Sequence, residues 1–194
     1  LLQQSSGLDY PEFSFHPLSD FNQLMLGDDV TKMTLHQEAY RQPNALFEYN
    51  GVNPQNLGLL LQRAYGERYA DLLSNKLWQK IAQDDASVVL DSEENNMPRT
   101  YCCLNATARD WLRIGIIILN EGKFNEKQIV PRSWVKEMKT PSATNPNYGY
   151  LTWLGTEHQE NRIYNPKSTA TGLHTEPFDD RDIIYLDGFG GQRV

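Results

Sequence analysis

One pair of side chains in this sequence has the spacing of a serine nucleophile and its base. Ser133 and Lys136 form a literal Ser-x-x-Lys, two residues after Pro131. A serine hydroxyl is a poor nucleophile at neutral pH, so it must lose its proton to a nearby base as it attacks. The other familiar nucleophile pattern, Gly-x-Ser-x-Gly, occurs nowhere in the sequence. The position of the one literal motif therefore has to be judged against the rest of the chain.

A tyrosine and two asparagines stand together just before a predicted helix. Tyr49 is followed directly by Asn50 and, four positions on, by Asn53. A phenol can transfer protons, but the chain has ten tyrosines, and most tyrosines are core residues with a hydrogen-bonded hydroxyl. Asn53 can act beside the tyrosine or can simply cap the helix that follows. Both interpretations of Asn53 stay open.

A glycine-rich turn is predicted at residues 187–192. It contains Gly188, Phe189 and Gly190, and glycine allows the backbone to approach a ligand closely. The alternative interpretation is a plain hairpin turn with no role in chemistry.

Other chemistry is disfavoured. The two cysteines, Cys102 and Cys103, are neighbours, and a bridge between adjacent residues is strained, so we expect two free thiols. The four histidines have no metal-ligand spacing, and we expect neither a metal nor an organic cofactor. The net charge of -7 with scattered Lys and Arg argues against nucleic acid as a partner. The longest aliphatic run, Ile116–Leu119, is far shorter than the roughly 20 residues that span a bilayer.

The elements that must position these side chains can be predicted from periodicity and capping signals. Residues 1–48 and 82–104 have little periodicity and are predicted to be irregular, the second stretch with short extended segments. Helices are predicted at 53–65 with Gly66 as the stop, at 69–81, at 107–119 and at 131–138. Strands are predicted at 148–154 and 182–186. Helical material therefore precedes strands, and we expect residues 1–145 to form a helical and loop subdomain and 146–194 to begin a sheet.

Four segments, in this order and spacing, resemble the β-lactamase-related serine hydrolases. This family includes class C β-lactamases, D-alanyl-D-alanine carboxypeptidases, certain esterases and 6-aminohexanoate-dimer hydrolases. The segments are LLQQSSGL (1–8), FEYNGVN (47–53), CLNATARD (103–110) with the residues that follow it to Val135, and DGFGGQ (187–192). The resemblance covers nearly the whole chain. It implies an α/β, β-lactamase/transpeptidase-like fold, with a helical subdomain packed against part of an antiparallel sheet.

The resemblance also implies roles for individual residues. Tyr49 would be the general base and acid that relays a proton between a serine and the leaving group, with Asn50 or Asn53 standing in for the asparagine that Gly51 replaces. Gly188, Phe189 and Gly190 would supply a backbone N–H to the oxyanion hole. Relatives carry a lysine or histidine in that motif, so its absence favours an esterase or amidase acting on a less charged substrate. Ser133 falls in a structural helix of the family and is rejected as the nucleophile. Arg109 and Asp110 would form a structural pair.

The segment that carries the family's Ser-x-x-Lys does not appear in this sequence. The chain starts at Leu1 without a leader and ends at Val194, where a strand is expected to begin, so we expect it to be cut at both ends. The predicted protein is a serine hydrolase that cleaves a small ester or amide through an acyl-enzyme, and the chain alone is expected to be inactive. Two alternatives remain: a non-catalytic scaffold that kept the fold, or a nucleophile supplied by a separate chain. The sequence leaves the compartment and the oligomeric state open.

Overall fold

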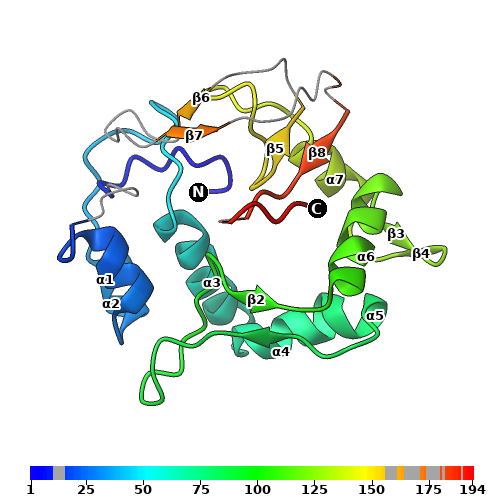
Figure 1. Cartoon of the computed structure of the whole chain (residues 1–194), viewed down its shortest axis with the longest axis horizontal. Helices are drawn as coiled ribbons and strands as arrows, with labels where there is room; N and C mark the ends of the chain where they lie inside the picture. Colours follow the sequence, from blue (N-terminus) through cyan, green and yellow to red (C-terminus); the bar gives the residue numbers. More distant parts are fainter. Residues whose placement is uncertain (11–15, 156–160, 164–170, 174–179, 181, 189) are drawn as a thin grey trace.

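The computed structural model of the protein describes residues 1–10, 16–155, 161–163, 171–173, 180, 182–188 and 190–194. In Figure 1 the elements follow one another around a rim, and both chain ends lie inside it. The helical elements are α1 (Asp20–Leu26), α2 (Val30–Leu35), α3 (Val52–Tyr65), α4 (Tyr69–Leu73), the π-helical turn η1 (Ser74–Trp78), α5 (Gln79–Ile81), α6 (Ala108–Leu119) and α7 (Arg132–Met138).

The first helices pack with α3 around one hydrophobic cluster. Its buried members include Leu24 of α1, Val30 of α2 and Val52 of α3. The prediction that residues 1–48 are irregular was wrong for α1 and α2. Both helices are short, and both begin at a capping side chain: Ser19 accepts a hydrogen bond from the backbone of Asn22, and Asp29 accepts one from Lys32. Capping and tertiary packing stabilise helices that are too short to show periodicity.

Helix α3 agrees with its prediction at one end and differs at the other. Gly66 ends it with a left-handed φ of 67°, as predicted. The helix begins at Val52, one residue earlier than predicted, so Asn53 lies inside the first turn and is not the capping residue. The side chain of Asn50 does accept a hydrogen bond from the backbone N–H of Asn53, at 3.0 Å. The helix predicted at 69–81 is present as α4, η1 and α5, with a π-helical turn in the middle.

Helix α6 starts as predicted, with Thr107 accepting a hydrogen bond from the backbone N–H of Asp110. The Asp110 carboxylate is buried and receives backbone N–H groups from Gln83, at 2.9 Å, and Asp84, at 3.2 Å. Its ion-pair partner is Arg113, so the pairing with Arg109 was wrong: residues three apart lie on one face of a helix, whereas adjacent residues do not. The Gln83 backbone hydrogen bond, with those from Thr107, Arg113 and Asp84, lowers the pKa of Asp110 to about 2. Asp110 therefore fixes the start of α6 to the end of α5.

This carboxylate predicts a specific loss of stability in acid. The folded-state pKa of Asp110 lies below the value of ~3.9 in an unfolded chain, so its contribution is present above pH ~4 and disappears as the pH falls toward ~2. Asp110→Asn should lower the melting temperature at pH 7 by several degrees and flatten the decline between pH 5 and pH 2. Circular dichroism melts at stepped pH measure both effects. A variant whose acid decline parallels that of the wild type would contradict this role.

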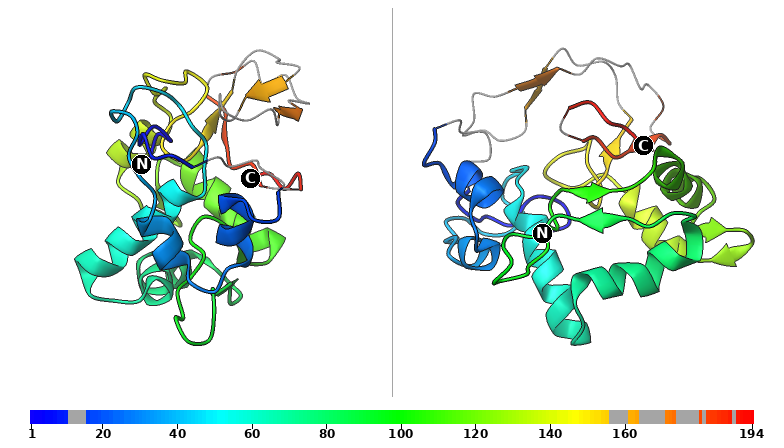
Figure 2. Two further views of the ribbon diagram at one scale, coloured as in Figure 1. Left: turned by 90° about the vertical axis from the view of Figure 1, so that its left-hand side faces the viewer. Right: turned by 60° about the horizontal axis from the view of Figure 1, so that its bottom comes forward.

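The strands form two-stranded antiparallel pairs within the described ranges. These are β1 (Ser87–Val88) with β2 (Leu104–Asn105), β3 (Lys123–Phe124) with β4 (Lys127–Gln128), β5 (Trp153–Leu154) with β8 (Ile184–Tyr185), and β6 (Asn161–Ile163) with β7 (Thr171–Leu173). The β5–β8 pair lies across the molecule from α4 and α5 (Figure 1 and Figure 2). The strand predicted at 182–186 is thus confirmed in its centre. The division of the chain at residue 145 stays a prediction.

The strand predicted at 148–154 was largely wrong. Only its last two residues form β5, because the chain turns back on itself and Tyr148 forms an antiparallel bridge with Trp153. Leu151 takes a left-handed φ of 54° in this turn. Alternating aromatic residues therefore reflect a packed turn here and not an extended strand.

The prediction of two free thiols was also wrong, because Cys102 and Cys103 are joined in a disulfide. Cys103 adopts a left-handed φ of 69°, which turns the chain sharply at this point. The turn brings two neighbouring sulfur atoms together, whereas extended neighbours point to opposite sides.

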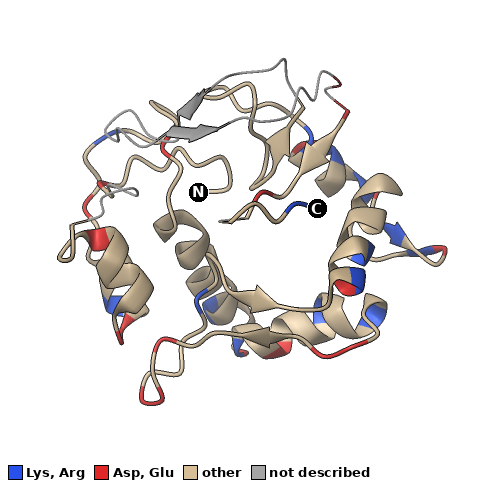
Figure 3. Cartoon of the chain, viewed as in Figure 1, with Lys and Arg blue, Asp and Glu red and all other residues tan. Residues whose placement is uncertain are grey.

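Among the residues that the structure describes, positions with Lys or Arg alternate with positions with Asp or Glu over the helices and hairpins (Figure 3). None of the helices in the described part of the chain has the length and apolarity needed to cross a membrane.

Candidate functional site

Tyr49 lies in an aromatic cluster that joins the loop before α3 to the β5–β8 pair. Its ring stacks on Trp153, with ring centroids 5.6 Å apart and an interplanar angle of 27°. It meets Tyr148 edge-on at 6.1 Å. Phe47 and Tyr185 complete the cluster, and its members other than Tyr49 are buried. Tyr148 and Trp153 are both buried core residues that pack against Tyr49.

The glycine-rich turn leaves the same cluster. Trp153 pairs in register with Tyr185, and the turn begins two residues after Tyr185. Leu186 and Val194 exchange two backbone hydrogen bonds, at 2.9 and 3.2 Å, so the segment between them is a hairpin. The side chain of Tyr49 and the strand that enters the glycine turn are therefore held by one set of aromatic contacts.

The backbone amides of this hairpin are partly used within it. The N–H of Gly188 donates to the carbonyl of Gln192 at 2.8 Å, and the N–H of Gly191 donates to the carbonyl of Gly188 at 3.0 Å. Gly190 has a left-handed φ of 103°. Phe189 lies outside the residues that the structure describes.

A buried polar network lies beside Tyr49, and the sequence alone did not single out its central residue, Gln4. Gln4 is 2% exposed. Its side-chain oxygen accepts hydrogen bonds from the side chain of Asn53 at 2.6 Å and from the backbone N–H of Asn50 at 3.3 Å. Its backbone carbonyl accepts the N–H of Glu48 at 2.7 Å. The only sequence signal for Gln4 was its place in the first of the four matched segments.

Two acceptor oxygens in this network have no hydrogen-bond partner among the described residues. They are Oε2 of Glu48 and Oδ1 of Asn53, and both side chains are buried. The other carboxylate oxygen of Glu48 accepts a hydrogen bond from the hydroxyl of Tyr40. A buried acceptor left unpaired costs about 1–3 kcal/mol, so this part of the site is suited to receive a donor.

Tyr148 is held in its neutral form. Burial raises its pKa well above the ordinary value, the neighbouring Tyr49 raises it further, and a hydrogen bond from Gln4 acts in the opposite direction. A phenolate on Tyr148 is therefore disfavoured.

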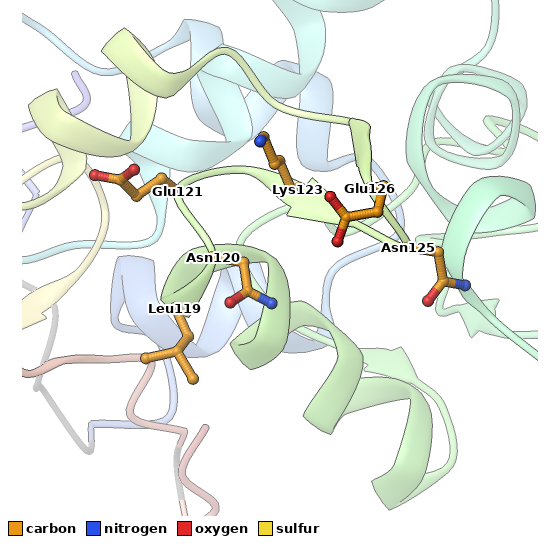
Figure 4. Close-up of a pocket in the computed structure, with 6 residues that line it drawn as sticks. All are labelled: Leu119, Asn120, Glu121, Lys123, Asn125 and Glu126. Carbon is orange, nitrogen blue, oxygen red and sulfur yellow. The ribbon is translucent and has the colours of Figure 1, made fainter.

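The serines that a motif search would pick do not join this site. Ser133 and Lys136 are exposed on α7, whose buried residue is Val135. Ser5 is buried, and its hydroxyl donates to Oδ1 of Asn44 at 2.9 Å. A surface hollow at the end of α6 and the β3–β4 hairpin is also separate, because its lining contains none of the predicted site residues (Figure 4). Across the described ranges, no cluster of three or more His, Cys, Asp or Glu side chains is placed to hold a metal ion.

Comparisons with known proteins point to one family, although no family model matches the chain. The sequence is 30% identical over 93 residues to 6-aminohexanoate-dimer hydrolase from Paenarthrobacter ureafaciens, a match that covers 47% of this chain and 23% of that protein. A candidate 6-aminohexanoate-dimer hydrolase from Bacillus anthracis has a similar structure, with a TM-score of 0.69 at 24% identity, over 82% of this chain and 47% of that one.

Two further solved structures share the fold. A candidate β-lactamase from Bacteroides dorei DSM 17855 matches with a TM-score of 0.58 at 20% identity, over 78% of this chain and 50% of that one. A penicillin-binding protein from Bacillus halodurans matches with a TM-score of 0.59 at 16% identity, over 79% of this chain and 56% of that one.

The chain thus spans less than a quarter of the curated relative and about half of each structural one. The structural likenesses give the fold, with helices and short antiparallel strand pairs, and the sequence match adds kinship to a hydrolase. Together they show a β-lactamase/transpeptidase-like fold and a partial sequence similarity to a 6-aminohexanoate-dimer hydrolase.

Proposed function

We propose that the protein containing this chain hydrolyses an ester or amide through an acyl-enzyme. In this proposal the chain supplies a proton-transferring phenol, Tyr49, its partner Asn53 and an oxyanion-binding turn. The nucleophilic serine and its lysine come from residues outside these 194. The observation that carries the proposal is the aromatic cluster that holds Tyr49 beside the strand leading into the glycine turn.

The unpaired oxygen of Asn53 supports this arrangement. Oδ1 of Asn53 is buried and unpartnered among the described residues, and a cationic donor such as a lysine ammonium would satisfy it. Asn53 does not cap α3, so the alternative structural role considered for it is not the one it plays.

The reaction follows from these parts. The serine oxygen attacks the carbonyl carbon while its proton passes to Tyr49, the proposed general base. The tetrahedral oxyanion receives N–H hydrogen bonds from the turn. Tyr49 then delivers the proton to the leaving alcohol or amine as the bond to it breaks. Water attacks the acyl-enzyme in the second half and restores the serine. Because Gly188 and Gly191 use their amides inside the hairpin, the proposed oxyanion donor is Gly190 or Phe189.

The substrate class follows from the residues of the turn. The segment DGFGGQ contains no lysine or histidine, so a substrate carboxylate would lack a cationic partner there. We propose an ester or amide without a charged group at this position, and neither a metal ion nor an organic cofactor takes part.

Covalent labelling tests the proposed function. A fluorophosphonate probe should add one phosphonyl group to the full-length protein, at a serine that lies outside residues 1–194 and three residues before a lysine. The separate 194-residue chain should not be labelled. Intact-mass and peptide mass spectrometry measure both results. Labelling of a serine within residues 1–194 would contradict the assignment of the nucleophile to residues outside this chain. A full-length protein that resists labelling would favour the non-catalytic scaffold.

A further inference from the structure

Residues 1–8 lie between the loop that carries Tyr49 and the turn that carries Tyr148. The carbonyl of Leu2 accepts the backbone N–H of Leu151 at 2.9 Å, which ties this segment to the sheet side. The carbonyl of Ser5 accepts the N–H of Asn44 at 2.8 Å, which ties it to the loop before α3. The segment is therefore fastened on both sides, and Gln4 lies between the two attachments.

The side chain of Gln4 reaches the start of α3. Its oxygen accepts hydrogen bonds from the side chain of Asn53 and from the backbone of Asn50. One amide oxygen thus joins residues 1–8 to the asparagine of the proposed site.

The conformation of Gln4 is tightly constrained. It is buried, its own N–H donates to the carbonyl of Leu1 at 3.0 Å, and its left-handed φ of 52° is unusual for a residue other than glycine. A buried amide whose oxygen accepts two hydrogen bonds, on a residue in an uncommon backbone conformation, is held by several contacts at once. Such a group fixes the orientation of its partners.

We propose that Gln4 is a positioning residue of the active site, which sets the rotamer of Asn53. The proposal rests on the proposed hydrolase function. Gln4 touches neither the nucleophile nor the substrate, and it acts by turning Oδ1 of Asn53 toward the donor that this oxygen lacks. Loss of the amide frees the Asn53 side chain to rotate. The chemical step therefore slows, while the affinity for the substrate does not change.

Gln4→Met in the full-length enzyme tests this role, because methionine is similar in size but cannot form these hydrogen bonds. We expect kcat per folded molecule to fall ~10- to 100-fold, the cost of a displacement of about 1 Å in a catalytic group, with KM unchanged. The matched control is Gln55→Met. Gln55 is equally buried on α3, but its amide bonds to Pro98 and Thr100, away from Tyr49. It should lower the melting temperature and leave kcat unchanged.

A double-mutant cycle with Asn53→Leu separates positioning from stability. If Gln4 acts through Asn53, adding Gln4→Met to Asn53→Leu should lower kcat less than the same change does in the wild type. Equal losses in both backgrounds, or a Gln4→Met enzyme with wild-type kcat, would overturn the inference. Tyr49→Phe in the same assay separates the two hypotheses: if it is inactive while Gln4→Met is normal, only the role of Gln4 fails, and if it is fully active, the proposed function fails.

Discussion

Replacing Tyr49 by phenylalanine in the full-length protein should lower kcat about 10²–10⁴-fold, the range for removal of a general acid–base group. The substitution deletes one hydroxyl and keeps the ring. Since the ring contacts with Trp153 and Tyr148 hold the residue in place, the variant should fold and bind substrate. The expected signature is therefore a lower kcat with little change in KM or melting temperature.

Steady-state kinetics with a chromogenic ester measure this effect. Tyr101→Phe is the matched control: its hydroxyl donates a part-buried hydrogen bond to the carbonyl of Leu24 at 2.9 Å, and its ring packs against the cluster of α1, α2 and α3. This control should lose some stability and no activity. Wild-type turnover in the Tyr49→Phe enzyme would remove Tyr49 from the mechanism.

The second large effect is expected at the glycine turn. Gly190 has a φ of 103°, and valine is strongly disfavoured at positive φ because of its branched Cβ. Gly190→Val should therefore reshape the hairpin and withdraw an oxyanion donor. We expect kcat to fall about 10²–10³-fold, the typical cost of one such donor.

A second glycine with a left-handed φ provides the control for this variant. Gly66 also has a left-handed φ, of 67°, but it ends α3, and a Cβ added there would meet nothing within 4 Å. Gly66→Ala should lower the melting temperature slightly and leave kcat unchanged. Comparable losses of activity in both variants would mean that Gly190 acts through overall stability and not through the oxyanion.

The long elements of the fold could be predicted from sequence because their signals are local. α3 ends at a glycine and α6 begins at a Thr107 cap. The apolar face expected for α3 is not the buried one, because Leu60 and Leu61 are exposed while Val52, Asn53, Gln55 and Gly58 are buried. α1 and α2 were missed, since six or seven residues are too few for periodicity and their stability comes from capping and from packing on α3.

Turns were the main source of error. Leu151 and Cys103 both adopt left-handed backbone conformations that their residue types do not favour. Tertiary contacts impose these conformations: the N–H of Leu151 reaches the carbonyl of Leu2, far away in sequence. An alternating aromatic stretch and a pair of adjacent cysteines are therefore misread when only neighbouring residues are considered.

The residues of the site could likewise be predicted only in part. Tyr49, Asn53 and the glycine turn were found through their resemblance to family segments, and their roles remain predictions. Gln4 could not be found by any local pattern, because its partner Asn53 lies 49 positions away along the chain. The unpaired buried oxygen of Glu48 could likewise not be predicted from sequence, because it depends on the tertiary contacts of Glu48 with Tyr40 and with the backbone of Gln4.

The most direct test of this account is the crystal structure of the full-length protein with a phosphonate bound covalently to its reactive serine. We expect the Tyr49 hydroxyl and an N–H of residues 189–190 each within about 3 Å of the phosphonyl group or the serine oxygen, and a lysine ammonium hydrogen-bonded to Oδ1 of Asn53. An adduct remote from the Tyr49 ring, with the glycine hairpin turned away from the phosphonyl oxygen, would contradict the proposed active site.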